Sequence, residues 1–127
     1  MNDWDDKDLA RLLGLTRIAL GAAAFLMPNV AMRGLIGQRA EPYPTNMLLR
    51  GLAGRDIAIG VGIVTAIETG APVRGWLEAS ALSDASDAVG TITSWKNLPS
   101  FRRLAFLALE VGAAAIGLQL ADSLDED

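Results

Sequence analysis

Four apolar segments, each long enough to form a helix that crosses a lipid bilayer, dominate this chain. They cover about residues 9–27, 47–68, 75–94 and 101–121 of a 127-residue sequence. A helix rises 1.5 Å per residue, so roughly 20 residues cross a hydrocarbon core of about 30 Å. The segments are too long and too rich in Ala, Leu and Gly for β-strands. The sequence therefore predicts an all-α fold built from four helices.

Prolines and short connections indicate how these helices are joined. Pro28 ends the first segment, because the residue before a proline is pushed out of helical geometry. Pro72 and Pro99 lie in the second and third connections, which are short. Short connections favour antiparallel neighbours, so we predict an antiparallel up-down four-helix bundle that is transmembrane.

The other parts of the chain fit a single domain, residues 1–127. The first connection is longer, and residues 30–37 within it are apolar around one arginine. This pattern predicts a short interfacial helix on the membrane surface between the first two long helices. Acidic residues gather in two terminal tails, 1–8 and 122–127.

Composition favours a membrane protein and excludes several kinds of site. Hydrophobic residues make up 51% of the chain and charged residues 20%, below the quarter or so typical of soluble domains. The absence of cysteine and histidine excludes disulfides, iron–sulfur clusters, zinc–thiolate sites and the usual haem ligand. We therefore expect no metal and no cofactor. The net charge is −4, and no basic block is interleaved with aromatic residues, so nucleic acid is not an expected partner.

Charge and tryptophan positions predict the orientation in the membrane. Three tryptophans fall at or just outside helix ends, where an amphipathic ring prefers the interface: Trp4, Trp76 and Trp95. The first and third connections carry more basic residues than the face with the termini: Arg33, Arg39, Lys96, Arg102 and Arg103 against Lys7, Arg11 and Arg74. The positive-inside rule therefore predicts that both termini are extracytoplasmic.

Charged residues inside the apolar segments need partners. The second segment contains the stretch RGLAGRDIAIG, residues 50–60, and the third carries a polar stripe at helical spacing: Ser80, Asp84, Asp87, Thr91 and Ser94. A lone charge at mid-membrane costs about 2.5–3.5 kcal/mol on the insertion scale, so pairing is expected. The sequence predicts an interior network in which three arginines face four carboxylates: Arg17, Arg50 and Arg55 with Asp56, Asp84, Asp87 and Glu110.

Small residues also recur at helical spacing and predict close helix packing. They form ridges in three segments: Gly14, Arg17, Gly21 and Ala24 in the first, Gly54, Ala58, Gly62 and Ala66 in the second, and Ala113, Gly117 and Ala121 in the fourth.

The charged network has two interpretations. In the structural one, ion pairs fix helix register and rotation. In the functional one, the network lines a site in which the carboxylates supply an acid and a base. The catalytic candidates are then Asp84, Asp87, Asp56 and Glu110, and the binding candidates are Arg17, Arg50 and Arg55.

Three groups of residues occur in order along the chain: Gly21, Pro28, Arg33 and Gly37; then Arg50, Arg55, Asp56 and Gly60; then Asp84 and Asp87. This pattern resembles small four-pass bacterial membrane proteins grouped as a domain of unknown function, which are distantly similar to DoxX-like four-helix proteins. The resemblance covers about residues 13–118. It implies a multi-pass protein of the cell inner membrane and carries no activity to transfer. The acidic tails and the polar third helix depart from a typical member.

Three functions remain open from the sequence. The first is a non-enzymatic integral membrane protein with a structural, complex-subunit or lipid-associated role. Its partners would be the lipid bilayer and either further copies of the chain, in a homo-oligomer, or a larger membrane complex. The second is a membrane enzyme that uses carboxylate acid/base chemistry on a lipid-like or terpenoid substrate. The third is a soluble helical bundle, disfavoured because Gly costs about 1 kcal/mol relative to Ala in a helix interior.

Overall fold

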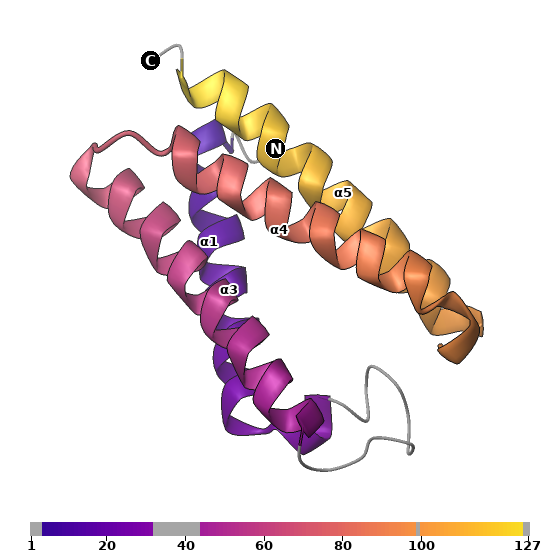
Figure 1. The fold of residues 1–127 in the computed structure, drawn as a ribbon. Coiled ribbons are helices and arrows are strands. Elements are labelled where there is room, and N and C mark those ends of the chain that lie inside the picture. Colours follow the sequence, from indigo (N-terminus) through magenta and orange to yellow (C-terminus); the bar gives the residue numbers. More distant parts are fainter. Residues whose placement is uncertain (1–3, 32–43, 99, 126–127) are drawn as a thin grey trace.

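The computed structural model describes residues 4–31, 44–98 and 100–125, and all regular structure in these ranges is helical (Figure 1). The long helices and one short 3-10 helix follow each other in this order: α1 (Asp6–Leu26), α3 (Pro44–Thr69), α4 (Arg74–Thr93), η2 (Trp95–Asn97) and α5 (Ser100–Asp125). The prediction of an all-α chain with a long helix in each apolar segment is confirmed for the described residues.

Two helices extend into the predicted acidic tails. The carboxylate of Asp5 accepts a hydrogen bond of 2.8 Å from the backbone N–H of Asp8, and this cap starts α1 at Asp6 rather than at residue 9. Acidic residues near a helix N-terminus also interact favourably with the helix dipole. At the other end of the chain, α5 continues through Asp125. The described parts of both tails are therefore largely helical.

The connection between α3 and α4 is a tight turn, as predicted. Gly70 has a φ of +69°, a left-handed conformation that glycine adopts without steric cost. The N–H of Ala71 then donates to the carbonyl of Ala66 at 3.0 Å, which closes the end of α3.

The predicted interfacial helix, residues 30–37, lies mostly outside the described residues. Residues 28–31 are helical, directly after α1 ends at Leu26. The basic residues at positions 33 and 39, which contributed to the predicted orientation, also lie outside the described ranges.

The long helices are arranged as two pairs (Figure 1). Along its length α1 packs against α3, and α4 packs against α5, whereas contacts between the two pairs are fewer. The pairs meet where the α3–α4 turn, the start of α1 and the end of α5 lie, and they diverge towards the opposite end. We call the first of these the closed end and the second the open end.

The hydrophobic core fills the closed end. Ile63 and Leu77 are fully buried there. Other buried aliphatic residues from the long helices, and one directly before α4, pack around them: Ala10, Ile59, Ala66, Val73, Leu120 and Ala121. Burying a large aliphatic side chain contributes about 1.5–3 kcal/mol. The two helix pairs are therefore held together mainly at this end.

Ion pairs surround the closed end. Arg11 of α1 contacts Glu68 of α3 at 2.6 Å. Arg74 at the start of α4 contacts Glu78 and, at 2.7 Å, Asp125 near the end of α5. Hydrogen bonds to Glu78 and Asp125 raise the pKa of the Arg74 guanidinium. Because these groups are exposed, the pairs orient helix ends more than they stabilise the fold.

Small residues bring α1 and α3 into close contact, but not all at the predicted positions. A Cβ added at Gly60 would lie 2.5 Å from the carbonyl oxygen of Gly14, and one added at Gly21 would lie 2.8 Å from that of Ala53. The predicted ridge of α1 is thus confirmed at Gly14 and Gly21. In α3 the contact with α1 uses Gly60, whereas a Cβ at Gly54 would meet nothing within 4 Å.

The other predicted ridges contact α4. A Cβ at Gly62 would lie 2.3 Å from the ring of Trp76, so this glycine admits the indole of α4 against α3. A Cβ at Gly117 would lie 3.3 Å from the Cβ of Ala81, and Ala121 is buried beside it on α5. The ridge of α3 was therefore wrong at Gly54, because that residue points away from both neighbouring helices.

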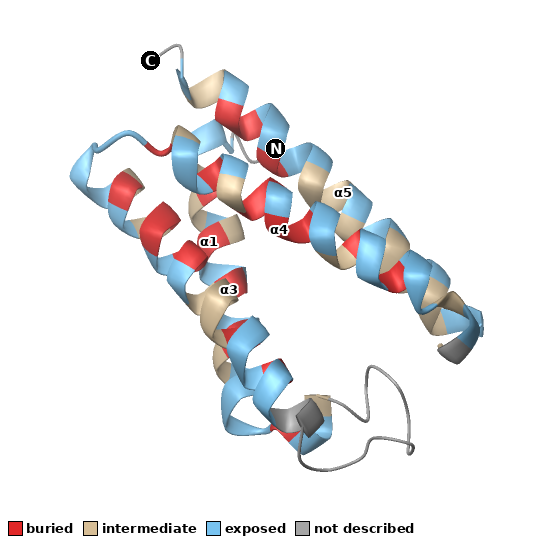
Figure 2. Cartoon of the chain, viewed as in Figure 1, coloured by how far each residue is buried: buried red, intermediate tan, exposed pale blue. Residues whose placement is uncertain are grey.

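Exposed positions, pale blue in Figure 2, occur along all four long helices, and many of them carry large apolar side chains. The most exposed include Leu26, Met47, Leu82, Leu109 and Phe101, the last at 83% of its surface. Among the described helices, α1 and α5 are long and apolar enough to cross a membrane, judged by length and composition alone.

Candidate functional site

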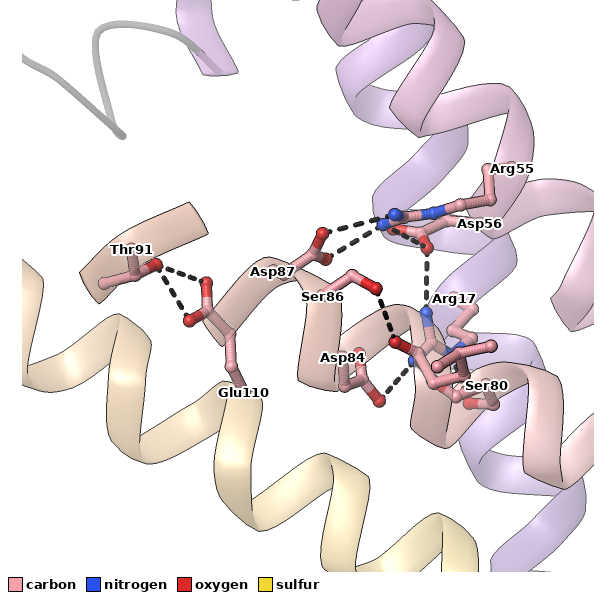
Figure 3. A network of polar contacts seen from close by, with 10 residues as sticks. Arg17, Arg55, Asp56, Ser80, Asp84, Ser86, Asp87, Thr91 and Glu110 are labelled. Carbon is pink, nitrogen blue, oxygen red and sulfur yellow. Dashed lines mark hydrogen bonds and ion pairs between the residues drawn. The ribbon is translucent and has the colours of Figure 1, made fainter. Parts of the chain in front are cut away.

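Arg17 is the centre of a polar network between the two helix pairs (Figure 3). It lies on α1 and is only 7% exposed. Its Nη1 donates to Asp56 of α3 at 2.8 Å, and its Nη2 forms an ion pair with Asp84 of α4. Its Nε donates to the hydroxyl of Ser80 at 2.7 Å, and Nη2 also donates to the Ser80 carbonyl at 3.2 Å. One guanidinium therefore connects α1, α3 and α4.

Arg55 forms the second part of the network. Its two terminal nitrogens donate to the two carboxylate oxygens of Asp87 at 3.2 and 2.9 Å, in a bidentate arrangement that joins α3 to α4. Its Nη2 also lies 3.5 Å from Asp56, the carboxylate that Arg17 binds. Asp56 thus lies between the two arginines and completes a continuous chain of charges.

Glu110 of α5 extends the polar region towards the open end. Both of its carboxylate oxygens lie within hydrogen-bonding distance of the Thr91 hydroxyl, at 2.9 and 2.8 Å. One hydroxyl has a single proton to donate, so it satisfies one of these oxygens at a time. In Figure 3 this pair lies beside the arginine network rather than within it.

The predicted polar stripe of α4 therefore faces the other helices. Ser80, Asp84 and Thr91 are buried, and Asp87 is half-buried. Ser94, the last predicted member, is exposed at the end of α4. Helical spacing was sufficient to identify this face, because every polar group from Ser80 to Thr91 on it finds a partner on another helix.

Arg50 does not join the predicted network. Its Nε donates to the backbone carbonyl of Phe25 at 3.2 Å, and its guanidinium carbon lies 5.8 Å from the centre of the Phe25 ring. These contacts place the side chain against the end of α1, away from the carboxylates. The reason is its position on α3: Arg50 lies more than one turn before Arg55, nearer the open end where the helix pairs have separated.

A cavity of about 730 Å³ occupies the space between the helix pairs. Its apolar walls come from the end of α1, the first half of α3, the end of α4 and the first half of α5, and include Leu20, Leu52, Ala53, Leu98 and Phe106. Charged groups of the network form its inner part: Arg55, Asp56, Asp87 and Glu110. The cavity thus combines a mostly apolar surface with a small charged region.

The charges of this region do not balance. Two guanidinium groups, those of Arg17 and Arg55, bind three of the carboxylates, and the fourth belongs to Glu110: Asp56, Asp84, Asp87 and Glu110. The described network therefore has a surplus of two negative charges when every group is ionised. With Arg50 included, as the sequence predicted, the surplus would have been one.

Asp84 and Asp87, two of the carboxylates considered as an acid and a base, bind different arginines. Asp84 binds Arg17, whereas Asp87 binds Arg55. In a carboxylate dyad, sharing one proton separates the acid from the base. Two carboxylates that each have their own guanidinium do not need to share a proton. Glu110 is the network carboxylate bound to a hydroxyl instead of an arginine.

Sequence patterns did not identify several members of the site. Ser80 was predicted only as part of a stripe, yet it binds Arg17 through both its hydroxyl and its carbonyl. Phe106 and Leu98 line the cavity without any distinguishing local pattern. The pairing of Thr91 with Glu110 had one available signal, the matching depth of these residues in antiparallel neighbours.

Within the described ranges, no three or more Asp or Glu side chains converge in a way that could hold a metal ion. Comparisons with protein-family models, with curated proteins and with solved structures find no match for this chain. The resemblance to small four-pass membrane proteins therefore stays a prediction, and the site must be interpreted from its own geometry.

Proposed function

We propose that this chain is a small, non-enzymatic integral membrane protein that binds an apolar or amphiphilic molecule between its two helix pairs. The cavity of about 730 Å³ carries this proposal. Small-molecule sites typically measure about 300–1,000 Å³ and combine apolar walls with a few polar groups. The cavity has this size and this character, since its charged groups are confined to one part of an otherwise apolar lining.

The outward surface supports a membrane location. Large apolar side chains are exposed on every long helix, and α1 and α5 have the length and composition of membrane-spanning helices. Soluble monomers rarely expose contiguous apolar patches larger than a few hundred Å². In a bilayer these faces contact lipid chains, so the soluble alternative is less well supported.

The charges of α3 and α4 are compatible with membrane insertion because they are paired. Arg55 and Asp87 neutralise each other between these two helices, and Arg17 binds Asp56 and Asp84. Ionisable residues inside membranes face the protein interior and pair with one another. In our proposal all four long helices cross the inner membrane in an up-down arrangement, and the two helix pairs diverge towards one face of the membrane.

The proposed orientation rests on the basic residues of the whole sequence. Among the described ones the two ends are equal, with Lys96, Arg102 and Arg103 at the open end and Lys7, Arg11 and Arg74 at the closed end, so the excess comes from Arg33 and Arg39 of the first connection. By the positive-inside rule the open end then faces the cytoplasm, and both termini are extracytoplasmic.

The enzymatic alternative depends on Glu110. Asp56, Asp84 and Asp87 are engaged with arginines, so Glu110 is the best-placed carboxylate for acid/base chemistry on a lipid-like substrate. A single carboxylate beside a threonine is a weak basis for such chemistry, because the other carboxylates among the described residues of the network are bound to arginines. We therefore favour binding over catalysis.

A cavity-filling substitution tests the proposal. Gly90 of α4 lines the cavity, and a Cβ added there meets nothing within 4 Å, so Gly90→Phe fills space without a clash at the backbone. Gly112→Phe on α5 is the matched control, because its added Cβ is equally unobstructed and it does not line the cavity. Membranes containing each protein are labelled with a diazirine-bearing alkanol, and labelled peptides are identified by mass spectrometry.

We expect labels inside the cavity in the wild type and in the Gly112→Phe control, and their loss in Gly90→Phe. Recovery of the wild-type protein in the supernatant without detergent would refute the membrane location. Labelling that Gly90→Phe leaves unchanged would refute the binding role.

A further inference from the structure

The charge balance of the cavity indicates the chemistry of its occupant. Resting on the proposed binding function, we propose that the molecule is an amphiphilic organic cation, with its positive charge at Glu110 and Asp87 and its apolar body against the walls. Within the described residues, the network of two guanidinium and four carboxylate groups lacks two positive charges when every group is ionised. Charges in a membrane interior are normally compensated by a partner.

Glu110 is the residue best placed to receive this charge. It lines the cavity, and its partner on α4 is the neutral hydroxyl of Thr91. Asp87 lines the same cavity and has a side chain that is 34% exposed despite its bidentate bond to Arg55. A cation between Glu110 and Asp87 would meet one carboxylate bound to a neutral hydroxyl and a second carboxylate that is partly exposed.

The walls determine the rest of the molecule. Leu20, Leu52 and Ala53 lie on the pair formed by α1 and α3. Phe106 lies on α5, and Leu98 lies in the connection between α4 and α5. An inorganic cation would leave these apolar surfaces in contact with water, whereas an organic cation buries them, at about 25 cal/mol per Å². The aromatic ring of Phe106 adds a surface that favours positive charge.

Charge also argues against two other occupants. An anionic lipid headgroup at the inner part of the cavity would face a region that is already negative. A second copy of this chain, inserted by the same surface, would bring two negative regions together, and like charges opposed across an interface cost several kcal/mol. Binding of an anionic headgroup or of a second copy would each give a different result in the titrations described next.

The test uses two probes of the same shape and opposite charge. Tetraphenylphosphonium and tetraphenylborate are titrated into the full-length protein in a non-ionic detergent, with binding followed by isothermal calorimetry and empty micelles subtracted. Glu110→Gln removes one negative charge and keeps an amide that can bond Thr91. Glu78→Gln removes the same charge from the exposed pair with Arg74, outside the cavity, and is the matched control.

We expect the wild type to bind the phosphonium and not the borate. Glu110→Gln should weaken phosphonium binding by about tenfold or more, since an unscreened opposite charge is lost, whereas Glu78→Gln should leave it unchanged. Gly90→Phe should abolish it by filling the cavity. This set of results would support a cation site.

Four results would overturn the inference. Equal binding of both probes, with Glu110→Gln without effect and Gly90→Phe still inhibitory, would mean that the cavity binds apolar molecules regardless of charge, and the proposed function would stand alone. Preference for the borate would indicate an anionic occupant. A detergent-solubilised dimer that Gly90→Phe dissociates would indicate a second copy. Absence of binding to either probe, together with cavity labelling that Gly90→Phe does not reduce, would reject the proposed function as well.

Discussion

Replacing Arg17 with methionine tests whether the charge network holds the helix pairs together. Methionine keeps a long, unbranched side chain but removes the guanidinium that bonds Asp56, Asp84 and Ser80. The substitution therefore leaves two carboxylates facing each other across α3 and α4 without the shared positive charge. Helix propensity changes little, because Arg and Met rank close together.

The expected magnitude follows from burial. Arg17 and Asp84 have side chains that are 8% and 11% exposed, so solvent screens their interaction little. Removing one partner of a buried ion pair costs about 3–5 kcal/mol, because the other charge stays buried without compensation. The pair with Asp56, whose side chain is 28% exposed and which also lies near Arg55, adds less. We expect the free energy of unfolding to fall by about 3 kcal/mol.

The assay is reversible unfolding in mixed dodecyl maltoside and SDS micelles, followed by far-UV circular dichroism. The double variant Arg17→Met with Asp84→Asn should recover part of the loss, because neutralising Asp84 removes the uncompensated charge. Arg74→Met at the exposed closed end is the matched control and should cost far less. The reasoning is refuted if Arg17→Met unfolds like the wild type, or if Asp84→Asn brings no recovery.

Two further substitutions probe packing and the cavity carboxylate. Gly60→Ala should lower the free energy of unfolding by about 1–3 kcal/mol, because the added Cβ would lie 2.5 Å from a backbone oxygen of α1. Gly54→Ala, whose added Cβ meets nothing within 4 Å, should raise the free energy of unfolding by up to about 1 kcal/mol. Equal effects of the two substitutions in the same micelle assay would contradict the close approach of α1 and α3. Thr91→Val should lower the free energy of unfolding by about 1 kcal/mol, because it leaves Glu110 without its hydroxyl partner. Thr93→Val, at an exposed hydroxyl, should lower it little. A larger loss of stability in Thr93→Val than in Thr91→Val would show that the Glu110 contact contributes nothing.

The sequence alone determined that there are long helices and where the chain breaks between them, although α1 and α5 extend beyond the predicted ends. Apolar length, Pro28, the turn at Gly70 and Pro99 separated the long helices, because each signal acts on the local backbone. The stripe from Ser80 to Thr91 was also predictable, since helical spacing decides which side chains share a face.

Tertiary structure alone decided which charges meet. Arg17 became the centre and Arg50 lay apart, although both were predicted as interior arginines of the same network. Periodicity identifies a polar face but not the helix that it faces, and a long arginine side chain reaches several neighbours. The partner is therefore selected by the relative rotation and depth of whole helices.

The same limit applies to packing and to the cavity. The small residues of α3 at positions 54–66 formed a convincing ridge, yet Gly60, outside that ridge, contacts α1, because the rotation of a helix is set by all of its neighbours at once. Short connections predicted antiparallel neighbours but said nothing about divergence of the two pairs. The cavity exists because the buried core lies at the closed end, and only the three-dimensional arrangement of all four long helices places a surplus of carboxylates at its inner part.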